Sequence, residues 1–352
     1  MSHRQTLAIA LVLLTFFVIS DLAYAGLLDG RDEYTQETSH TITIQPDGQI
    51  GASTPDGHIT VEAWDGKDVS LVITKRVRTR RGAASAESYF AKMDVDINKS
   101  SSNLEIIGDV PNHAVGYGFS IDYEMKVPAD VGLELRTSDG AVRVHGVYGN
   151  VYARSSDGDI SVNEIGEAEL RTSDGNIRAD AIEGDVSAIT SDGDIRITNV
   201  GGDANIRSSD GDIDCREVRG LVVVQLSDGD ARMQAVHGGV SARSSDGVLI
   251  VRDAAGPVEL KTSDGDIELS LAQPIPMSRV TCTTSDGNIR LNLEETAAFT
   301  IAAKTSDGRV NIDLPGKYER DEKSKRVEGH VNGGGPAVRL RTSDGSITIE
   351  KT

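Results

Sequence analysis

Aspartates that recur at a nearly fixed spacing are the residues of this chain best placed to act together. Each belongs to a Ser-Asp-Gly triplet, and the triplets from Ser138 to Ser343 mostly begin eighteen residues apart. If each copy forms one turn of a stack, the carboxylates line up in a column. Such a column could bind calcium, which takes about 6–8 oxygen ligands. The period, however, differs from that of the glycine-rich calcium-binding nonapeptide.

We favour a structural role for the same triplets. Asp-Gly forms a tight corner when the carboxylate accepts local backbone N–H groups and the glycine adopts a positive φ. The sequence therefore predicts structural corners at Asp139 and Gly140, Asp157 and Gly158, Asp174 and Gly175, Asp192 and Gly193, Asp210 and Gly211, Asp228 and Gly229, Asp246 and Gly247, and Asp264 and Gly265.

Basic residues stand two positions before the serine in most copies, and the clearest are Arg136, Arg154, Arg171, Arg207 and Arg243. Side chains alternate in direction along a strand, so these arginines should all point outward beside the acidic column. We favour charge compensation as their role, because like charges on neighbouring strands repel one another. The alternative is a binding stripe for an acidic glycan or a lipid headgroup.

The sequence shows no set of residues suited to catalysis. The histidines, among them His40, His58 and His145, share no repeat position and no metal-ligand spacing. There is no nucleophile elbow, and no glycine-rich phosphate loop followed by lysine. We therefore predict no enzyme activity, no cofactor and no metal site. The alternative is a polysaccharide-active β-helix enzyme, whose cleft would have to lie near Pro274 or Pro315.

The two cysteines, Cys215 and Cys282, lie four repeat units apart. At about 4.8 Å per stacked strand they are roughly 19 Å apart, whereas a disulfide needs Cα atoms within about 7 Å. We expect both to be buried as small hydrophobic residues.

Composition and the N-terminus indicate an exported protein. Residues 1–25 combine a basic start, an apolar run from Leu7 to Ile19 and the sequence Ala23-Tyr24-Ala25, which is typical of a secretory signal peptide. The mature chain would begin at Gly26, and no later segment is apolar enough to span a bilayer. A formal net charge of −19 disfavours nucleic acid as a partner.

The elements that carry the triplets are predicted to be short strands. Apolar residues alternate on both sides of each Asp-Gly corner, as in Val186 and Ala188 before one corner and Ile195 and Ile197 after it. Asp-Gly between such strands could also form hairpins of a meander or barrel. We favour an all-β fold, a single-stranded β-helix (β-solenoid) of coils of about 18 residues, because stacked coils cover one another's apolar positions.

Three regions follow along the chain. Residues 1–25 are the signal peptide, and residues 26–130 are predicted to form a β-rich cap with degenerate early repeats and one short helix over 83–93, with Ser85 as its N-cap. Residues 131–352 form the solenoid of Ser-Asp-Gly repeats. A charged excursion at 315–336 interrupts it, and we expect that excursion to be mobile.

The segment from Ile121 to Pro128, the Thr-Ser-Asp-Gly units that follow it, and the upstream run from Val61 to Gly66 are similar to a bacterial family of β-strand repeat proteins known as putative adhesins, a domain of unknown function. The resemblance covers most of the mature chain. It implies a repeat architecture and an adhesin-like role, and it implies no activity.

We therefore predict an exported, non-enzymatic β-solenoid, periplasmic or extracellular, that offers an adhesin-like binding or scaffolding surface in the bacterial envelope. Its partner would be an envelope or extracellular glycan or protein, and no nucleic acid. The alternatives are the polysaccharide-active enzyme and a calcium-dependent structural repeat protein.

Overall fold

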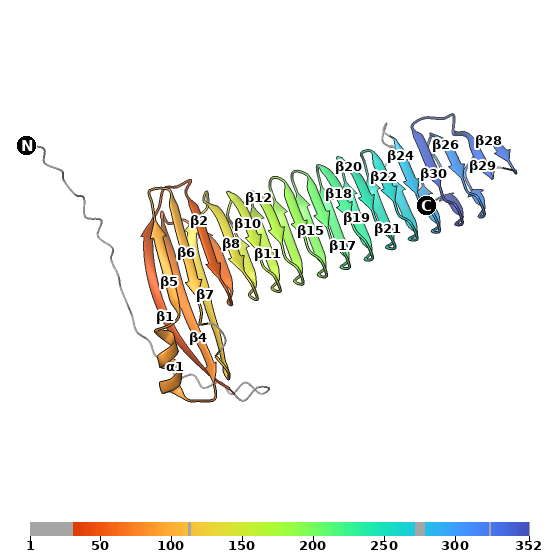
Figure 1. Cartoon of the computed structure of the whole chain (residues 1–352). Coiled ribbons are helices and arrows are strands. Elements are labelled where there is room, and N and C mark those ends of the chain that lie inside the picture. The colour runs from red at the N-terminus through yellow and green to blue at the C-terminus, as the bar shows by residue number, and fades with distance from the viewer. Residues whose placement is uncertain (1–30, 112–113, 272–278, 324, 352) are drawn as a thin grey trace, which may run out of the picture.

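The computed structural model describes residues 31–111, 114–271, 279–323 and 325–351. The predicted signal peptide and the corner at Pro274 lie outside these residues. Figure 1 shows a long rod of stacked coils with a broader cap at its N-terminal end. Within the described chain, no helix is both long enough and apolar enough to cross a membrane.

Each coil of the rod contributes one strand to each of two parallel sheets, so the β-solenoid prediction is confirmed. One sheet, sheet B, contains β8 (Gly132–Thr137), β10 (Asn150–Arg154), β12 (Glu167–Arg171), β14 (Val186–Ile189), β16 (Ala204–Arg207), β18 (Leu221–Gln225), β20 (Gly239–Arg243), β22 (Val258–Lys261) and β24 (Val280–Thr283). The other, sheet A, contains β9 (Val142–His145), β11 (Ile160–Ile165), β13 (Ile177–Ile182), β15 (Ile195–Val200), β17 (Ile213–Val218), β19 (Ala231–Val236), β21 (Leu249–Ala254), β23 (Ile267–Leu271) and β25 (Ile289–Leu293).

The core is a thin layer of aliphatic side chains between the two sheets. The parallel register places like positions over one another, so Ile177 pairs with Ile195 and Ile195 with Ile213. These inward residues are buried, while their neighbours along each strand face solvent. Cys215 on sheet A and Cys282 on sheet B are both free and buried, and burial raises the pKa of each thiol to about 12.

The N-terminal cap contains the one helix of the described chain, as the fold prediction stated. Its elements are β1 (Asp32–Thr43), β2 (Gln49–Thr54), β3 (Ile59–Trp64), β4 (Asp68–Thr79), α1 (Ala83–Phe90), β5 (Asp94–Lys99), β6 (Asn103–Asp109) and β7 (Tyr117–Pro128). The helix begins after Gly82, so the prediction of Ser85 as N-cap is wrong.

Strand order in the cap departs from chain order. β2 and β3 form the first coil of the rod, yet the later strands β6 and β7 pair in parallel on its outer side. β5 then pairs antiparallel with β6, and β4 and β1 continue antiparallel from β7. These antiparallel strands cover the open edges that the first coil would otherwise present to other chains.

At the C-terminal end, too, the coils do not stack in chain order. β30 (Ala337–Arg341) and β31 (Ile347–Lys351) insert between the coil of β24 and β25 and the coil of β26 (Phe299–Lys304) and β27 (Val310–Ile312). The serine N–H groups show the same order, since Ser343 donates to Ser285 and Ser306 donates to Ser343, each at 2.9 Å.

The expected mobile excursion is instead ordered structure. β28 (Gly316–Asp321) and β29 (Arg326–Val331) form an antiparallel hairpin, and β29 pairs with β26 at the end of sheet B. A hairpin rich in charged residues protects a sheet edge from pairing with another chain, which accounts for its charge.

Candidate binding surface

The Ser-Asp-Gly corners stack along one edge of the rod. The Asp157 N–H donates to the carbonyl of Ser138 in the preceding coil, and the buried Ser155 hydroxyl accepts the N–H of Gly158 at 2.9 Å. That hydroxyl also lies 3.1 Å from the carbonyl oxygens of Ser138 and Gly140, to which it donates. The inward hydroxyl, and not the aspartate carboxylate as the sequence predicts, therefore accepts the local backbone N–H of the corner.

The corner glycines are needed for close stacking and not for a positive φ, so that part of the sequence interpretation is wrong. Among the described residues, no corner glycine from Gly140 to Gly265 has a positive φ. A Cβ atom built on Gly193 would lie 2.0 Å from the carbonyl oxygen of Gly175 in the preceding coil. Only glycine lets the backbones of successive coils approach this closely.

The backbone is strained near the second corner of six consecutive coils. Six non-glycine residues occupy equivalent positions there with φ between 54° and 57°, namely Glu164, Ala181, Asn199, Glu217, Ala235 and Asp253. This conformation costs an L-residue about 1–2 kcal/mol. The stacking of equivalent corners in consecutive coils holds it in place.

The hydroxyl ladder should contribute measurably to stability. Thr190 donates to the carbonyl oxygens of Ser173 and Gly175 and accepts the N–H of Gly193. In Thr190→Val the Gly193 N–H loses its partner in a buried corner, so we expect a loss of about 1–3 kcal/mol. Urea unfolding measures this loss of stability. The corner should still form in the variant, because Leu226 occupies the same position in another coil without a hydroxyl group.

The matched control is Thr281→Val, at an outward position of β24, where we expect a change within about 0.5 kcal/mol. Equal midpoints for the Thr190 variant and the wild type would show that the ladder contributes nothing.

A second ladder uses the acid that often follows the glycine. The Asp194 carboxylate accepts the N–H of Asp212 at 2.9 Å, and Asp212 accepts that of Asp230 at the same distance. The ladder starts in the cap, where Asp122 accepts the N–H of His58, and His58 Nδ1 accepts the N–H of Ala141. These side chains serve the stack and are not free to act on a ligand.

The outer aspartate column brings like charges together. Partial desolvation and the adjacent carboxylates of Asp264 and Asp344 raise the pKa of Asp286. Within the described residues, no group of three or more His, Cys, Asp or Glu side chains is arranged to hold a metal ion.

Stability should depend on pH through the first pair of this column. Burial, a hydrogen bond with Asp139 and the charge of Asp139 raise the pKa of Asp56 to about 6. Because the folded pKa is raised, the stability that the proton contributes is complete below the ordinary aspartate pKa and is lost as the pH rises through about 6. Asp56→Asn, which resembles the protonated state, should be more stable than wild type at neutral pH.

After allowance for solvent screening of these partly exposed groups, we expect a gain of about 1 kcal/mol at pH near 8 and none near 4. Melting temperatures at the two pH values measure it. Asp139→Asn should give a gain of the same sign, because it removes the neighbouring charge. A shift of the same size at both pH values would contradict the assignment.

The predicted basic stripe lies on the outer face of sheet B, and most of its members already have partners. Arg136 pairs with Glu134, Arg171 with Glu169 at 2.6 Å and Arg243 with Glu259 at 3.3 Å. Arg207 donates twice to the Gln225 side chain, and Arg154 lies in register between Arg136 and Arg171. These contacts favour charge compensation over an open stripe for an acidic ligand.

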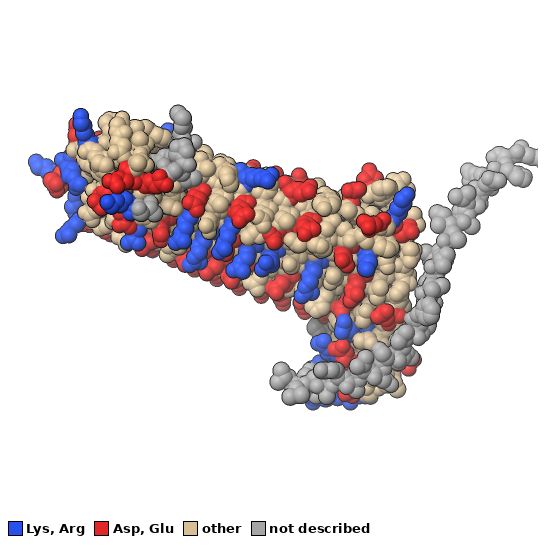
Figure 2. Space-filling model, turned by 180° about the vertical axis from the view of Figure 1, so that it is seen from behind, with Lys and Arg blue, Asp and Glu red and all other residues tan. Residues whose placement is uncertain are grey.

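Sheet A shows the same mixing of charge. Arg216 binds the carboxylate of Asp214 through two hydrogen bonds of 2.8 Å, and Arg196 lies 3.5 Å from the same group. Figure 2 shows basic and acidic side chains intermingled along the rod when it is seen from behind.

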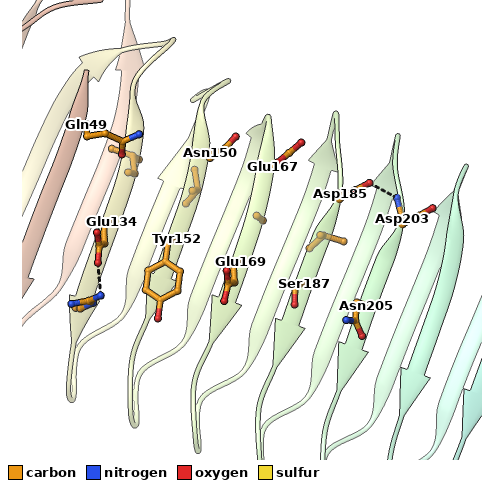
Figure 3. A pocket seen from close by; sticks show the side chains of 15 residues that line it. Gln49, Glu134, Asn150, Tyr152, Glu167, Glu169, Asp185, Ser187, Asp203 and Asn205 are labelled. Atoms are coloured by element: carbon orange, nitrogen blue, oxygen red, sulfur yellow. Dashed lines mark hydrogen bonds and ion pairs between the residues drawn. The ribbon is translucent and has the colours of Figure 1, made fainter. Parts of the chain in front are cut away.

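A hollow that sequence reasoning missed lies on sheet B beside the cap. It measures about 700 Å³ and spans the coils from β2 to β16. Figure 3 shows its side chains in two rows, with Gln49, Asn150, Glu167, Asp185 and Asp203 in one and Glu134, Tyr152, Glu169, Ser187 and Asn205 in the other. The available signal was Tyr152, a bulky aromatic at an outward position of the repeat.

Comparison with known proteins agrees with this architecture. The sequence matches the Toastrack DUF4097 family over residues 38–247 and again over 218–350. The chain belongs to this family. No curated protein matches the Toastrack chain.

Three solved structures are similar to this Toastrack chain. A putative cell adhesion protein from Clostridium sporogenes has 9% identity and a TM-score of 0.19, with 90% of this chain and 100% of that chain covered. A putative adhesin from Bacteroides fragilis has 11% identity and a TM-score of 0.29, with 90% and 97% covered. A putative lipid binding protein from Parabacteroides distasonis has 12% identity and a TM-score of 0.29, with 89% and 96% covered.

Proposed function

We propose that this protein is an exported, non-enzymatic rod of the bacterial envelope, periplasmic or extracellular, whose outer faces act as an adhesin-like binding or scaffolding surface. The observation that carries the proposal is the open hollow on sheet B, lined by amide, hydroxyl, carboxylate and phenol groups on a rigid scaffold. A site of this kind holds a ligand by hydrogen bonds and shape, and needs no reacting group.

The placement of the histidines supports a role without catalysis. His58 accepts a backbone N–H in the ladder, His145 contacts Asn163, and His330 contacts Thr300 at the far end of the rod. These three rings are distributed along the rod and do not converge on one site. The signal-peptide pattern at residues 1–25 supports export.

The binding proposal is tested with the mature chain from Gly26, immobilised and exposed to an extract of bacterial envelope. We expect an envelope glycan or protein to be retained and to be eluted by free mature chain. Retention of nothing above a blank resin would overturn the binding role.

Export and the absence of catalysis are tested separately. In an expressing bacterium, the protein should leave the cytoplasm and begin at Gly26 on N-terminal sequencing, and an intact N-terminus in the cytoplasm would contradict export. Incubation with acidic polysaccharides should release no new reducing ends and no unsaturated products. Their appearance would establish the enzyme alternative.

A further inference from the structure

The side chains that line the hollow on sheet B recur once per strand along the rod. Tyr152 is in register with Glu134 on one side and Glu169 on the other, and Ser187 and Asn205 continue the same row. Neighbouring strands lie about 4.8 Å apart, so the row offers one side chain per step over roughly 20 Å. A linear polymer lying along the rod axis would meet a new hydrogen-bonding group at each step.

Tyr152 is an aromatic residue that does not pack in the buried core. From Val131 to Ala298 the sequence contains two aromatic residues, Tyr148 and Tyr152, and neither belongs to the buried core. Figure 3 shows the Tyr152 ring broad side on, lying over the sheet among the polar side chains of the hollow. The guanidinium of Arg136 lies 5.6 Å from the ring centroid and helps to hold the ring in place.

The hollow carries an excess of negative charge. Its lining includes five carboxylates and one guanidinium, that of Arg136, which is already paired with Glu134. Glu169 is paired with Arg171, at the margin of the hollow. The remaining acids, Glu167, Asp185 and Asp203, have no ion pair among the described residues. Asp185 Oδ1 accepts the N–H of Asp203 at 2.8 Å and Asp203 Oδ1 that of Leu221 at 2.7 Å, so each aspartate offers a ligand its second carboxylate oxygen only. This balance disfavours an acidic glycan or an anionic headgroup and favours a ligand with amines.

We propose that the hollow binds an oligosaccharide of amino sugars, with one pyranose ring stacked on Tyr152 and the sugar amines beside Glu167 and Asp185. The inference rests on the proposed binding function and names its ligand class. Ring faces of sugars present C–H groups that pack on an aromatic ring, and their hydroxyls both donate and accept. The hollow offers side chains that both donate and accept hydrogen bonds, namely Asn150, Ser187 and Asn205.

A cationic peptide would satisfy the charge but fits the rest less well. The backbone groups of sheet B are used in strand pairing between β2 and β16, so no strand can be added there. The apolar residues at the hollow are buried in the core and form no pocket for peptide side chains; they are Leu133, Val151, Ala168 and Val186.

The test is calorimetric titration of the mature chain with a glucosamine hexamer at mildly acidic pH, with N-acetylglucosamine hexamer, oligogalacturonate and oligolysine as comparison ligands. We expect the glucosamine hexamer to bind most tightly and oligogalacturonate not to bind. Tyr152→Ser should weaken binding about tenfold. Serine fits this strand position because Ser187 occupies its equivalent two coils away.

Two further variants sharpen the result. Tyr148→Ser removes the other tyrosine of this stretch, which is exposed and lies outside the hollow, and should leave binding unchanged. Glu167→Gln should reduce the preference for glucosamine over N-acetylglucosamine. All variants should melt within a few degrees of wild type, so a loss of binding cannot be ascribed to unfolding.

Three outcomes would overturn the inference: no binding of the amino-sugar hexamer, binding that ignores the loss of Tyr152, or tighter binding of oligolysine. The envelope extract separates this inference from the proposed function. If the wild type and Tyr152→Ser retain an envelope component equally well, the protein binds the envelope through another surface, and only the amino-sugar site fails.

Discussion

Replacing Gly193 with alanine should destabilise the rod by about 3–5 kcal/mol, which is at the upper end for a single methyl group. The new Cβ would lie 2.0 Å from the Gly175 carbonyl oxygen and 2.5 Å from its carbon. Both are backbone atoms of the preceding coil, which is itself stacked on the coil before it. Relief of the clash therefore requires two coils to separate, with loss of the hydrogen bonds between them.

The matched control is Gly51→Ala, on the outward face of β2. A Cβ there would meet nothing closer than 3.9 Å, so we expect a change within about 1 kcal/mol. Urea unfolding of both variants measures the difference. If Gly193→Ala and Gly51→Ala unfold at the same denaturant concentration, coils in solution are not stacked as closely as the structure shows.

Removing the Asp122 carboxylate should have the second largest effect, with Asp122→Ala costing about 3 kcal/mol. This side chain is buried, accepts the N–H of His58 at 2.9 Å and pairs with Arg76 at 2.7 Å. Arg76 also pairs with Glu33, so the carboxylate joins the cap to the first coil of the rod. Its loss leaves a backbone donor and a half-buried guanidinium without their main partner.

Asp122→Asn separates the two contributions, because the amide oxygen can still accept the N–H of His58 while the charge is gone. We expect a smaller loss, about 1–2 kcal/mol. Thermal unfolding followed by hydrogen exchange locates the effect, which should appear first in β1, β4 and β7. Unchanged exchange in the cap of Asp122→Ala would contradict this role.

Local sequence pattern was sufficient for the parts of the fold that repeat. The alternation around residues such as Val186 and Ile195 predicts two strands per coil, and each coil has them. The same pattern could not show why glycine stands at the corner. That reason is a contact with Gly175 or its equivalent in the preceding coil, and it appears only once the coils are stacked.

The order of coils at both ends could not be predicted either. Every copy has nearly the same inward residues, so the sequence does not specify which copies stack on each other. What decides the order is the need to cover open edges, which depends on strands as distant as β6 and β2. The hollow was missed because its two rows together cross six coils, and the place of Tyr152 in it becomes visible only beside side chains from neighbouring copies.

The insertion of β30 and β31 beneath the coil of β26 and β27 has a consequence for how such a protein can change in length. The last strands of the chain pair on both sides, with the coil of β24 and β25 and with the coil of β26 and β27. Losing the residues after 336 would therefore leave the coil of β26 and β27 without the coil on which it stacks. The coils between β10 and β21 are consecutive and stacked in chain order. Gene duplication or deletion in that stretch would lengthen or shorten the rod by about 4.8 Å per unit and leave both locked ends intact.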